Sequence, residues 1–434
     1  MKKQLLLAGL LCAASVIVSA QSGNKGYYKD VFMDSGINLT STVDLPVIRY
    51  LDLTMEAFIS ASPKNGETMT AIDTILQNAI FSGNSIDENG VLLYPDGGPR
   101  FRMIYVNGGG AGTHGKTLGK TGRDNLRKYV ANGGSYLGSC AGAFLGSFGT
   151  IANKTPRETY LHIWPGQTGN TYLNRNDTGH LNYTGMFIEE NSPILKYYDF
   201  GGDHHIDSVK HNMGCYADTG EMYPTGTEVL LRFDYPELVK DQSFHKKISA
   251  WAYKANRTSG RVILCGSHPE GVTEGEQLEL MAAFVKYLFE GNGSPVLKGT
   301  LVNGEPRTMN CSTSDNNPEY TKLGDRQYHH FKVEVPKGVK QLTINLDAIK
   351  GWDNYDMYLF ADNHTFAFMD NARYKNISLG FTKSITIDNP TEGALYISVF
   401  CATTVGTVDT RYGKQYTGRT DVLNGVPYII SVKY

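Results

Sequence analysis

Apolar and polar positions follow two different patterns along this chain, and the change falls near residue 295. Over residues 25–295, short apolar runs typical of buried strands alternate with runs that carry apolar residues at helical spacing. The clearest of these predict strands at 101–106 and 261–266 and helices at 125–131 and 277–289. Strands that alternate with helices indicate an α/β fold around a mostly parallel sheet.

The last predicted helix has a defined start and end. Thr273 and Glu276 have the spacing of a capping box, so we expect them to begin the helix. Residues 290–295, Glu-Gly-Asn-Gly-Ser-Pro, have the composition of a linker and predict a domain boundary.

Helical spacing is absent from the sequence after this linker. Apolar and polar residues instead alternate with a period of two in runs separated by turn residues, at 331–335, 342–346, 357–360, 384–387, 395–399 and 428–432. This pattern predicts a second domain over residues 296–434, an all-β antiparallel sandwich or jelly roll.

The N-terminus reads as a signal peptide over residues 1–20. A short basic start is followed by an apolar run and by small residues before Gln21. The run is too short to span a membrane comfortably, and no other segment is long and apolar enough. We therefore expect an exported protein, periplasmic or extracellular, with residues 21–295 as its first folded domain.

The amino-acid composition limits which classes of partner are expected. Lys and Arg number 41 against 43 Asp and Glu, so nothing in the charge favours nucleic acid. The sequence gives no reason to expect a cofactor.

The mature chain is expected to contain five cysteines. Loss of the leader leaves Cys140, Cys215, Cys265, Cys311 and Cys401, an odd number that implies at least one free thiol. Two disulfides are possible from the sequence, Cys311–Cys401 and Cys215–Cys265.

Cys140 carries the most specific signal. The run 134–145 reads as a strand that ends at Gly138, a turn that carries Cys140, and a helix that begins at once. This is the form of a nucleophile elbow, with cysteine in place of serine. The helix start favours a thiolate, which is the nucleophilic form of cysteine.

A candidate base and acid follow the strand predicted at 261–266. His268 and Glu270 lie two positions apart on an extended segment, so their side chains leave on the same side. A cysteine nucleophile needs a base, and the base needs a third group that fixes its tautomer. Cys140, His268 and Glu270 supply all three.

A glycine-rich loop follows the strand predicted at 101–106. Backbone amides of residues 107–112 can approach a developing oxyanion because glycine has no Cβ. His114, in the same stretch, is a candidate substrate contact. The alternative is a phosphate loop, since Gly110, Gly115, Lys116 and Thr117 match its spacing. We disfavour it because 113–121 is too rich in glycine and lysine to open a helix at once.

These motifs resemble the class I glutamine amidotransferase-like superfamily. The runs 92–102, 105–110 and 134–143 are most similar to the branch called the biotin-protein ligase N-terminal domain, and the resemblance covers about residues 25–292. It implies a flavodoxin-like sheet with the Cys-His-Glu triad at its nucleophile elbow. It also implies oxyanion donors at Gly109 or Gly110 and at Ala141.

The second domain has a resemblance of its own. Residues 352–359 and 393–399 are similar to the bacterial pre-peptidase C-terminal domain, which accompanies secreted peptidases. Asp353 and Asp356 are calcium-ligand candidates, but we interpret them as turn residues. Residues 201–207 with His211 have the composition of a zinc cluster, yet no matching pair occurs elsewhere, so we interpret them as a polar loop near the active site.

The chain is therefore expected to be a cysteine hydrolase that cleaves an amide bond, in a peptide or a γ-glutamyl compound, with no metal. The attached sandwich favours peptides as substrates and also offers a surface for a cell wall or polymer. The alternative is a non-catalytic binding or scaffold protein on the same fold, against which the intact Cys140, His268 and Glu270 argue.

Overall fold

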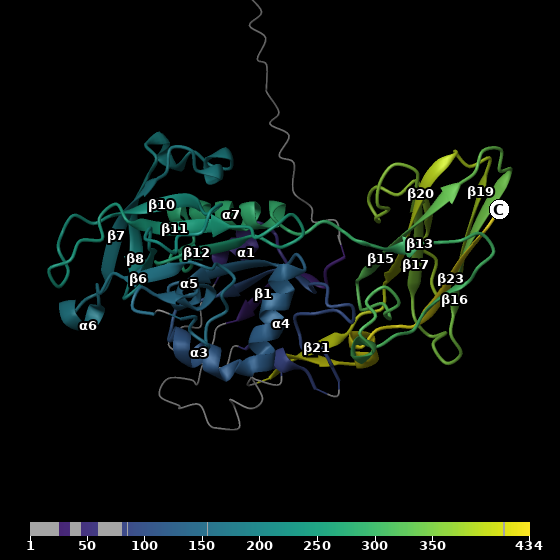
Figure 1. Ribbon diagram of the computed structural model, residues 1–434, viewed down its shortest axis with the longest axis horizontal. Coiled ribbons are helices and arrows are strands. Elements are labelled where there is room, and N and C mark those ends of the chain that lie inside the picture. Colours follow the sequence, from purple (N-terminus) through teal and green to yellow (C-terminus); the bar gives the residue numbers. More distant parts are fainter. Residues whose placement is uncertain (1–25, 35–44, 60–79, 85, 154, 411–412) are drawn as a thin grey trace, which may run out of the picture.

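The computed structural model describes residues 26–34, 45–59, 80–84, 86–153, 155–410 and 413–434 of the 434-residue chain. Its first part is one large sheet with helices on both faces (Figure 1). Five strands are mutually parallel, in the order β2 (Met55–Ile59), β1 (Lys29–Asp34), β3 (Phe101–Val106), β4 (Ser135–Ser139) and β12 (Val262–Cys265).

The same sheet continues with strands that run antiparallel to one another. They are β11 (Ile248–Tyr253), β10 (Glu228–Asp234), β7 (Asn182–Ile188) and β8 (His205–His211). Short strands β5 (Gly149–Thr150), β6 (Gln167–Asn170) and β9 (Cys215–Ala217) attach beside them. The α/β prediction is confirmed, and the antiparallel half is an addition that the sequence pattern did not indicate.

The helices pack their apolar faces against the two faces of the large sheet. On one face pack α1 (Pro46–Tyr50) and α7 (Gly275–Glu290), and on the other α3 (Ala111–Thr117), α4 (Gly119–Ala131) and α5 (Ala141–Gly146). A short α6 (Arg175–Thr178) lies beyond the antiparallel strands. None of the described helices is long and apolar enough to cross a membrane.

Two expectations about helix ends were wrong. The helix α7 has Glu274 as its N-cap, with no side-chain cap hydrogen bond, so Thr273 and Glu276 form no capping box. The glycine- and lysine-rich stretch after the predicted loop does open a helix at once, since α3 begins at Ala111 and α4 follows it directly. Packing explains the glycines: a Cβ at Gly115 would lie 1.7 Å from the carbonyl oxygen of Thr159.

The second part is a sandwich of two antiparallel sheets, as its period-two pattern predicts. One sheet contains β13 (Leu297–Thr300), β15 (Tyr328–Val335), β20 (Gly393–Cys401), β17 (Met357–Asp362) and β18 (Tyr374–Asn376), with β13 pairing in parallel. The other contains β14 (Arg307–Met309), β23 (Tyr428–Lys433), β16 (Gln341–Ala348) and β19 (Lys383–Asp388). All six predicted strands are present.

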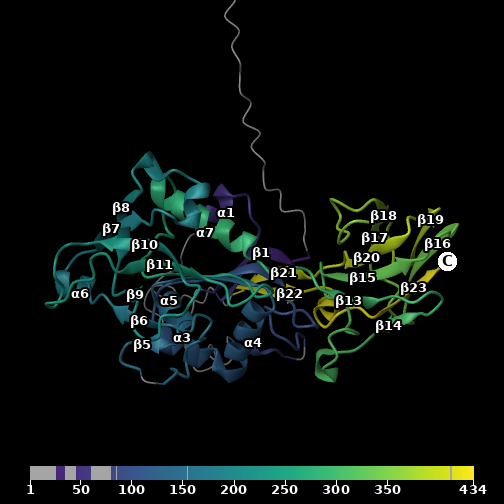
Figure 2. The ribbon, with the colours of Figure 1, turned by 45° about the horizontal axis from the view of Figure 1, so that its top comes forward.

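A buried ion pair joins the two parts. Arg100, just before β3, places its guanidinium 3.0 and 3.1 Å from the carboxylate oxygens of Asp325, and both side chains are at most 1% exposed. The hairpin of β21 (Gly406–Thr410) and β22 (Gly413–Thr417) reaches back from the sandwich toward the large sheet (Figure 2). Its Tyr416 hydrogen-bonds Arg100 and packs edge-on against Tyr28.

Candidate active site

The candidate residues gather at the carboxyl edge of the parallel strands. Asp34 pairs with Val106, and Val106 pairs in turn with Gly138, so β1, β3 and β4 end at the same level. Cys265 at the end of β12 pairs with Ser139. Ligand sites of open α/β sheets form at this edge, because the loops that follow neighbouring strands meet there.

Cys140 occupies a tight turn between β4 and α5. Its backbone has φ 49° and ψ −105°, a conformation that costs a non-glycine residue free energy and is held here by its surroundings. The Cys140 amide donates to the carbonyl of Cys265 at 2.8 Å. Cys140 as a whole is 7% exposed, and its Sγ lies 3.5 Å from the carbonyl oxygen of Asn212. The predicted elbow is therefore present.

His268 and Glu270 follow β12 and form a hydrogen-bonded pair. His268 Nδ1 lies 2.9 Å from Glu270 Oε1, and the Glu270 side chain is buried. The His268 amide donates to the Lys210 carbonyl at 2.8 Å, which ties this loop to the end of β8. The carboxylate can thus fix the tautomer and the orientation of the imidazole.

Opposing influences set the charge of His268. Burial lowers its pKa, because an environment poor in water disfavours the imidazolium. The negative charges of Cys140 and Glu270, with hydrogen bonds to both, outweigh burial and hold the pKa of His268 well above its ordinary value. The imidazole beside Cys140 is therefore held in its protonated form.

The glycine loop lies against both the nucleophile and the base. The Gly142 amide donates to the Asn107 carbonyl at 3.2 Å, which joins the loop to the first turn of α5. A Cβ at Gly108 would lie 2.3 Å from Cε1 of His268, so only glycine fits beside the ring. The amides of Gly109, Gly110 and Ala141 have no hydrogen-bond acceptor among the described residues. Their assignment as oxyanion donors stays a prediction.

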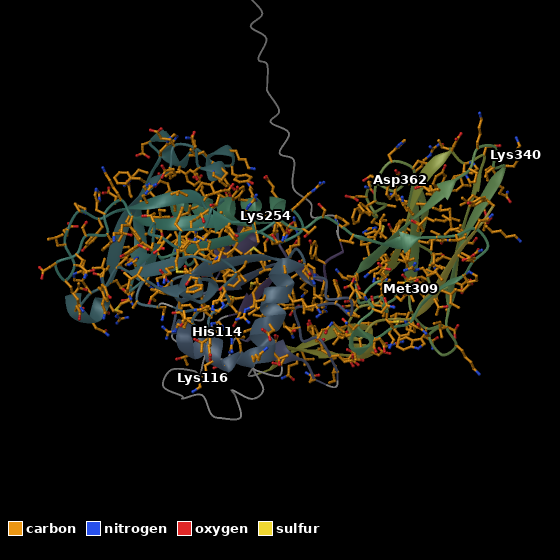
Figure 3. The ribbon with its side chains drawn as sticks, in the orientation of Figure 1. His114, Lys116, Lys254, Met309, Lys340 and Asp362 are labelled. Atoms are coloured by element: carbon orange, nitrogen blue, oxygen red, sulfur yellow. The ribbon has the colours of Figure 1, made fainter. Side chains whose placement is uncertain are left out.

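His114 does not sit in the loop but in the middle of α3 (Figure 3). Its Nε2 lies 2.7 Å from Oδ2 of Asp34, and both side chains are buried. The pair links α3 to the end of β1 beside the candidate triad. The substrate contact assigned to His114 stays a prediction, and the contact observed for its ring is the one with Asp34.

The phosphate-loop alternative is not supported by this geometry. Gly110 is the N-cap of α3, while Gly115, Lys116 and Thr117 form the last turn of that helix. A phosphate loop needs these residues where the loop enters the helix, because its backbone amides must wrap the phosphate. The sequence spacing of a phosphate loop is therefore present, but the backbone structure of a phosphate loop is not.

His211 belongs to β8 and is not part of a polar loop, which corrects the interpretation of 201–207 with His211. Its Nδ1 lies 2.8 Å from Ser267 Oγ and its Nε2 2.7 Å from Thr171 Oγ1, beneath the ring of Phe244. Burial and, to a smaller extent, the charge of His268 lower the pKa of His211 to about 3. This ring is thus a neutral support of the loop that carries His268.

Two other cysteines, Cys215 and Cys265, lie near Cys140. Burial raises the pKa of Cys215 well above its ordinary value and that of Cys265 to about 12, and the charge of Cys140 adds to both shifts. All five cysteines of the described residues are free, so neither open disulfide is formed. Cys215 and Cys265 are therefore protonated, unreactive thiols at neutral pH.

No group of three or more metal-ligating side chains occurs within the described ranges. Asp356 accepts a hydrogen bond from the Gly380 amide at 2.7 Å, and its own amide donates to Thr403 Oγ1 at 2.8 Å. These contacts are those of a turn residue, as interpreted from the sequence.

Two contributors to the site had no signal in the sequence. The Asn212 carbonyl reaches the thiol from the turn between β8 and β9, far along the chain, through the pairing of antiparallel strands. Tyr105 OH lies 2.8 Å from Ser139 Oγ beneath the triad, and its position in a buried strand gave no indication of this. Gly108 lies in the predicted loop, one residue before the glycines that were named.

Comparison with known proteins bears on the first half of the site. Residues 74–160 match the family described as "Biotin-protein ligase, N terminal", which confirms the resemblance for a segment that contains the glycine loop and Cys140. His268 and Glu270 lie outside the matched segment. No curated protein sequence matches the chain.

Solved structures similar to the chain include one for each part. One is described as a glutamine amidotransferase, with 18% identity and a TM-score of 0.30 over 44% of this chain and 80% of that chain. Another is the pre-peptidase C-terminal domain of a collagenase from Bacillus anthracis, with 12% identity and a TM-score of 0.18 over 32% of this chain and all of that one.

Proposed function

We propose that this protein is an exported cysteine hydrolase that cleaves an amide bond through an acyl-enzyme on Cys140. The observation that carries the proposal is the grouping of three residues: a strained cysteine elbow, an imidazole whose pKa is held high beside it, and a buried carboxylate 2.9 Å from that imidazole. This is the arrangement that nucleophilic catalysis requires.

In the first half of the reaction, the Cys140 thiolate attacks the carbonyl carbon and a C–S bond forms. The oxyanion that develops is stabilised by amides of Gly109 or Gly110 and of Ala141. As the tetrahedral intermediate collapses, the C–N bond breaks and His268 gives its proton to the leaving amine. A thioester on Cys140 remains.

In the second half, water attacks the thioester and His268 accepts a proton from it. The C–S bond breaks, a carboxylic acid leaves, and the thiolate and imidazolium are restored. Glu270 keeps Nδ1 of His268 protonated and oriented throughout, so the other nitrogen handles the transferred proton. No group outside the chain is needed to balance these steps.

The substrate is a peptide or a small amide. The sandwich favours peptides, by its similarity to a domain of secreted peptidases, and it offers a surface for a cell wall or polymer. Export follows from the basic, then apolar, then small-residue pattern of residues 1–20, which lie outside the described residues.

The proposal is tested by incubating a mixed peptide pool, γ-glutamyl peptides included, with the wild type and with Cys140→Ala and reading the products by mass spectrometry. Cleavage by the wild type and none by Cys140→Ala is the expected result. Equal products from both would place the chemistry elsewhere or in a contaminant, and no cleavage by either would reject the peptidase assignment.

A further inference from the structure

Two large apolar side chains, Tyr172 and Met213, lie on the surface of segments that lead to Cys140. Tyr172 is 41% exposed and Met213 is 36% exposed. Their segments are neighbours, because the Met213 amide donates to the Leu173 carbonyl at 2.7 Å and so continues the antiparallel pairing of β6 with β9. Neither side chain takes part in the steps of hydrolysis described above.

The contact between Asn212 and the nucleophile fixes the position of Met213. Cys140 Sγ lies 3.5 Å from the Asn212 carbonyl oxygen. That oxygen and the Met213 Cα belong to one planar peptide unit, so this Cα lies within about 6.5 Å of Sγ. In the proposed reaction the acyl half of the substrate becomes bonded to Sγ, and its side chain is attached one carbon beyond the carbonyl. That side chain therefore begins within reach of Met213.

The backbone at both positions is left-handed. Tyr172 has φ 58° and Met213 has φ 54°. This region favours glycine and asparagine and is uncommon for larger residues. The chain therefore carries large apolar side chains at two positions where a small or polar residue would cost less. Backbone strain of this kind concentrates at functional sites, where the surrounding structure holds it in place.

Side-chain amides hold both segments in this form. Asn170 Oδ1 accepts a hydrogen bond from the Tyr172 amide at 2.6 Å, and Asn212 Oδ1 accepts one from the Arg175 amide at 3.0 Å. The apolar surface is thus positioned before a ligand arrives, which lowers the entropy lost on binding.

We propose that Tyr172 and Met213 form an apolar subsite that binds a large apolar or aromatic side chain on the acyl half of the substrate. The inference rests on the function proposed above and adds the class of residue that this site selects. Binding removes the exposed surface of both side chains from water together with that of the substrate, whereas a glycyl substrate leaves it exposed.

The test needs no cleavable substrate. Acetyl-phenylalanyl and acetyl-glycyl chloromethyl ketones alkylate a thiol as chloride leaves, and they differ only in the side chain beside the ketone. Their rates with Cys140, each divided by the rate with iodoacetamide, are measured by mass spectrometry of the Cys140 peptide. We expect the wild type to prefer the phenylalanyl reagent by about 30-fold, within the range of apolar pockets.

Polar substitution at the subsite should reduce this preference. Met213→Asn keeps a residue that tolerates the left-handed backbone and should lower the preference about tenfold. Met213→Leu restores an apolar side chain and should keep most of it. Tyr172→Asn should act in the same direction as Met213→Asn and serves in its place if that variant does not fold.

An exposed leucine of the sandwich provides the matched control. Leu379 is 83% exposed, and Leu379→Asn should keep the wild-type preference. Equal relative rates of the two ketones in the wild type, failure of either ketone to label Cys140, or an unchanged preference in Met213→Asn or Tyr172→Asn would overturn the proposal.

Failure of the proposed function has a different signature. If the peptide pool is cleaved with no enrichment of apolar or aromatic residues on the acyl side, the subsite is rejected and the hydrolase stands. If the variants lose the preference in alkylation but the wild type cleaves no peptide, the hydrolase assignment alone is rejected, and the apolar site beside Cys140 is still measured.

Discussion

His268 Nδ1 lies 2.9 Å from Glu270 Oε1, although the two residues are separated in the chain by Pro269 alone. The base and its orienting carboxylate are therefore supplied by one short loop after β12. The Lys210 carbonyl at the end of β8 anchors this loop through the His268 amide. The orientation of the base thus depends on the antiparallel half of the sheet as well as on the parallel half that supplies Cys140.

The close packing of Gly108 against the His268 ring predicts that a larger residue at position 108 lowers activity. Gly108→Ala would place a methyl group 2.3 Å from Cε1 of the ring, so the imidazole must move away from Cys140. We expect alkylation of Cys140 at pH 6 and turnover to fall by about 100-fold with the fold retained, since small displacements of catalytic groups are expensive. Gly271→Ala is the matched control, because a Cβ there meets nothing within 4 Å. Wild-type rates in Gly108→Ala would contradict the placement of the ring.

The buried His211 predicts a pH dependence of stability. The pKa of His211 is about 3 in the folded protein and near 6.5 when unfolded, so the unfolded chain binds more protons between these values. Stability is complete above pH 6.5 and is lost as the pH falls, by about 2 kcal/mol at pH 5 from this residue. Urea unfolding at pH 7.5 and pH 5, followed by tryptophan fluorescence, measures the loss.

His211→Gln should show a pH dependence smaller by that amount, whereas His180→Gln, which changes an exposed histidine, should keep the wild-type dependence. Identical pH dependences of unfolding in the wild type and His211→Gln would show that His211 is not buried in its neutral form.

The junction between the two parts predicts a large loss of stability. Arg100→Met leaves the carboxylate of Asp325 buried without its charged partner, with only the Thr404 hydroxyl still donating to it, which costs about 3–5 kcal/mol. The double variant Arg100→Met/Asp325→Leu should recover part of this loss. Lys120→Met removes a partner of the exposed Asp124 and should change the free energy of unfolding by less than about 0.5 kcal/mol. Equal effects of Arg100→Met and Lys120→Met would contradict the buried pair.

The absence of disulfides among the cysteines of the described residues predicts how many thiols react in the denatured protein. A protein of residues 21–434, denatured without reductant, should react with five equivalents of a thiol reagent. A Cys311–Cys401 or Cys215–Cys265 disulfide would lower the count to three, and peptide mapping would identify the pair.

Much of the fold was accessible from hydrophobic pattern alone. Period-two alternation identified every one of the six strands proposed for the sandwich. In β16, β19 and β23 the buried positions alternate with more exposed ones, whereas β15, β17 and β20 are buried at most positions. The buried runs that flank Cys140 and precede His268 were equally clear. Local propensity failed at α3, where Gly115 is required by the contact with Thr159 and not by a loop.

The parts of the site that the sequence did not indicate depend on contacts between distant segments. Asn212 reaches Cys140 only because β7, β8, β10 and β11 extend the sheet, and no local motif marks that extension. Tyr105 looks like any core tyrosine until β3 is placed beside β4. Arg100 likewise gave no sign of its pairing with Asp325, which depends on how the sandwich docks.

Acid-quenched mass spectrometry of the protein during turnover tests the central claim most directly. Wild-type protein mixed with a cleaved peptide and quenched within milliseconds should carry the acyl fragment as a hydroxylamine-sensitive adduct on the Cys140 peptide. Cys140→Ser should carry no such thioester. Cleavage that proceeds without an adduct, and that persists in Cys140→Ala, would contradict a nucleophilic role for Cys140.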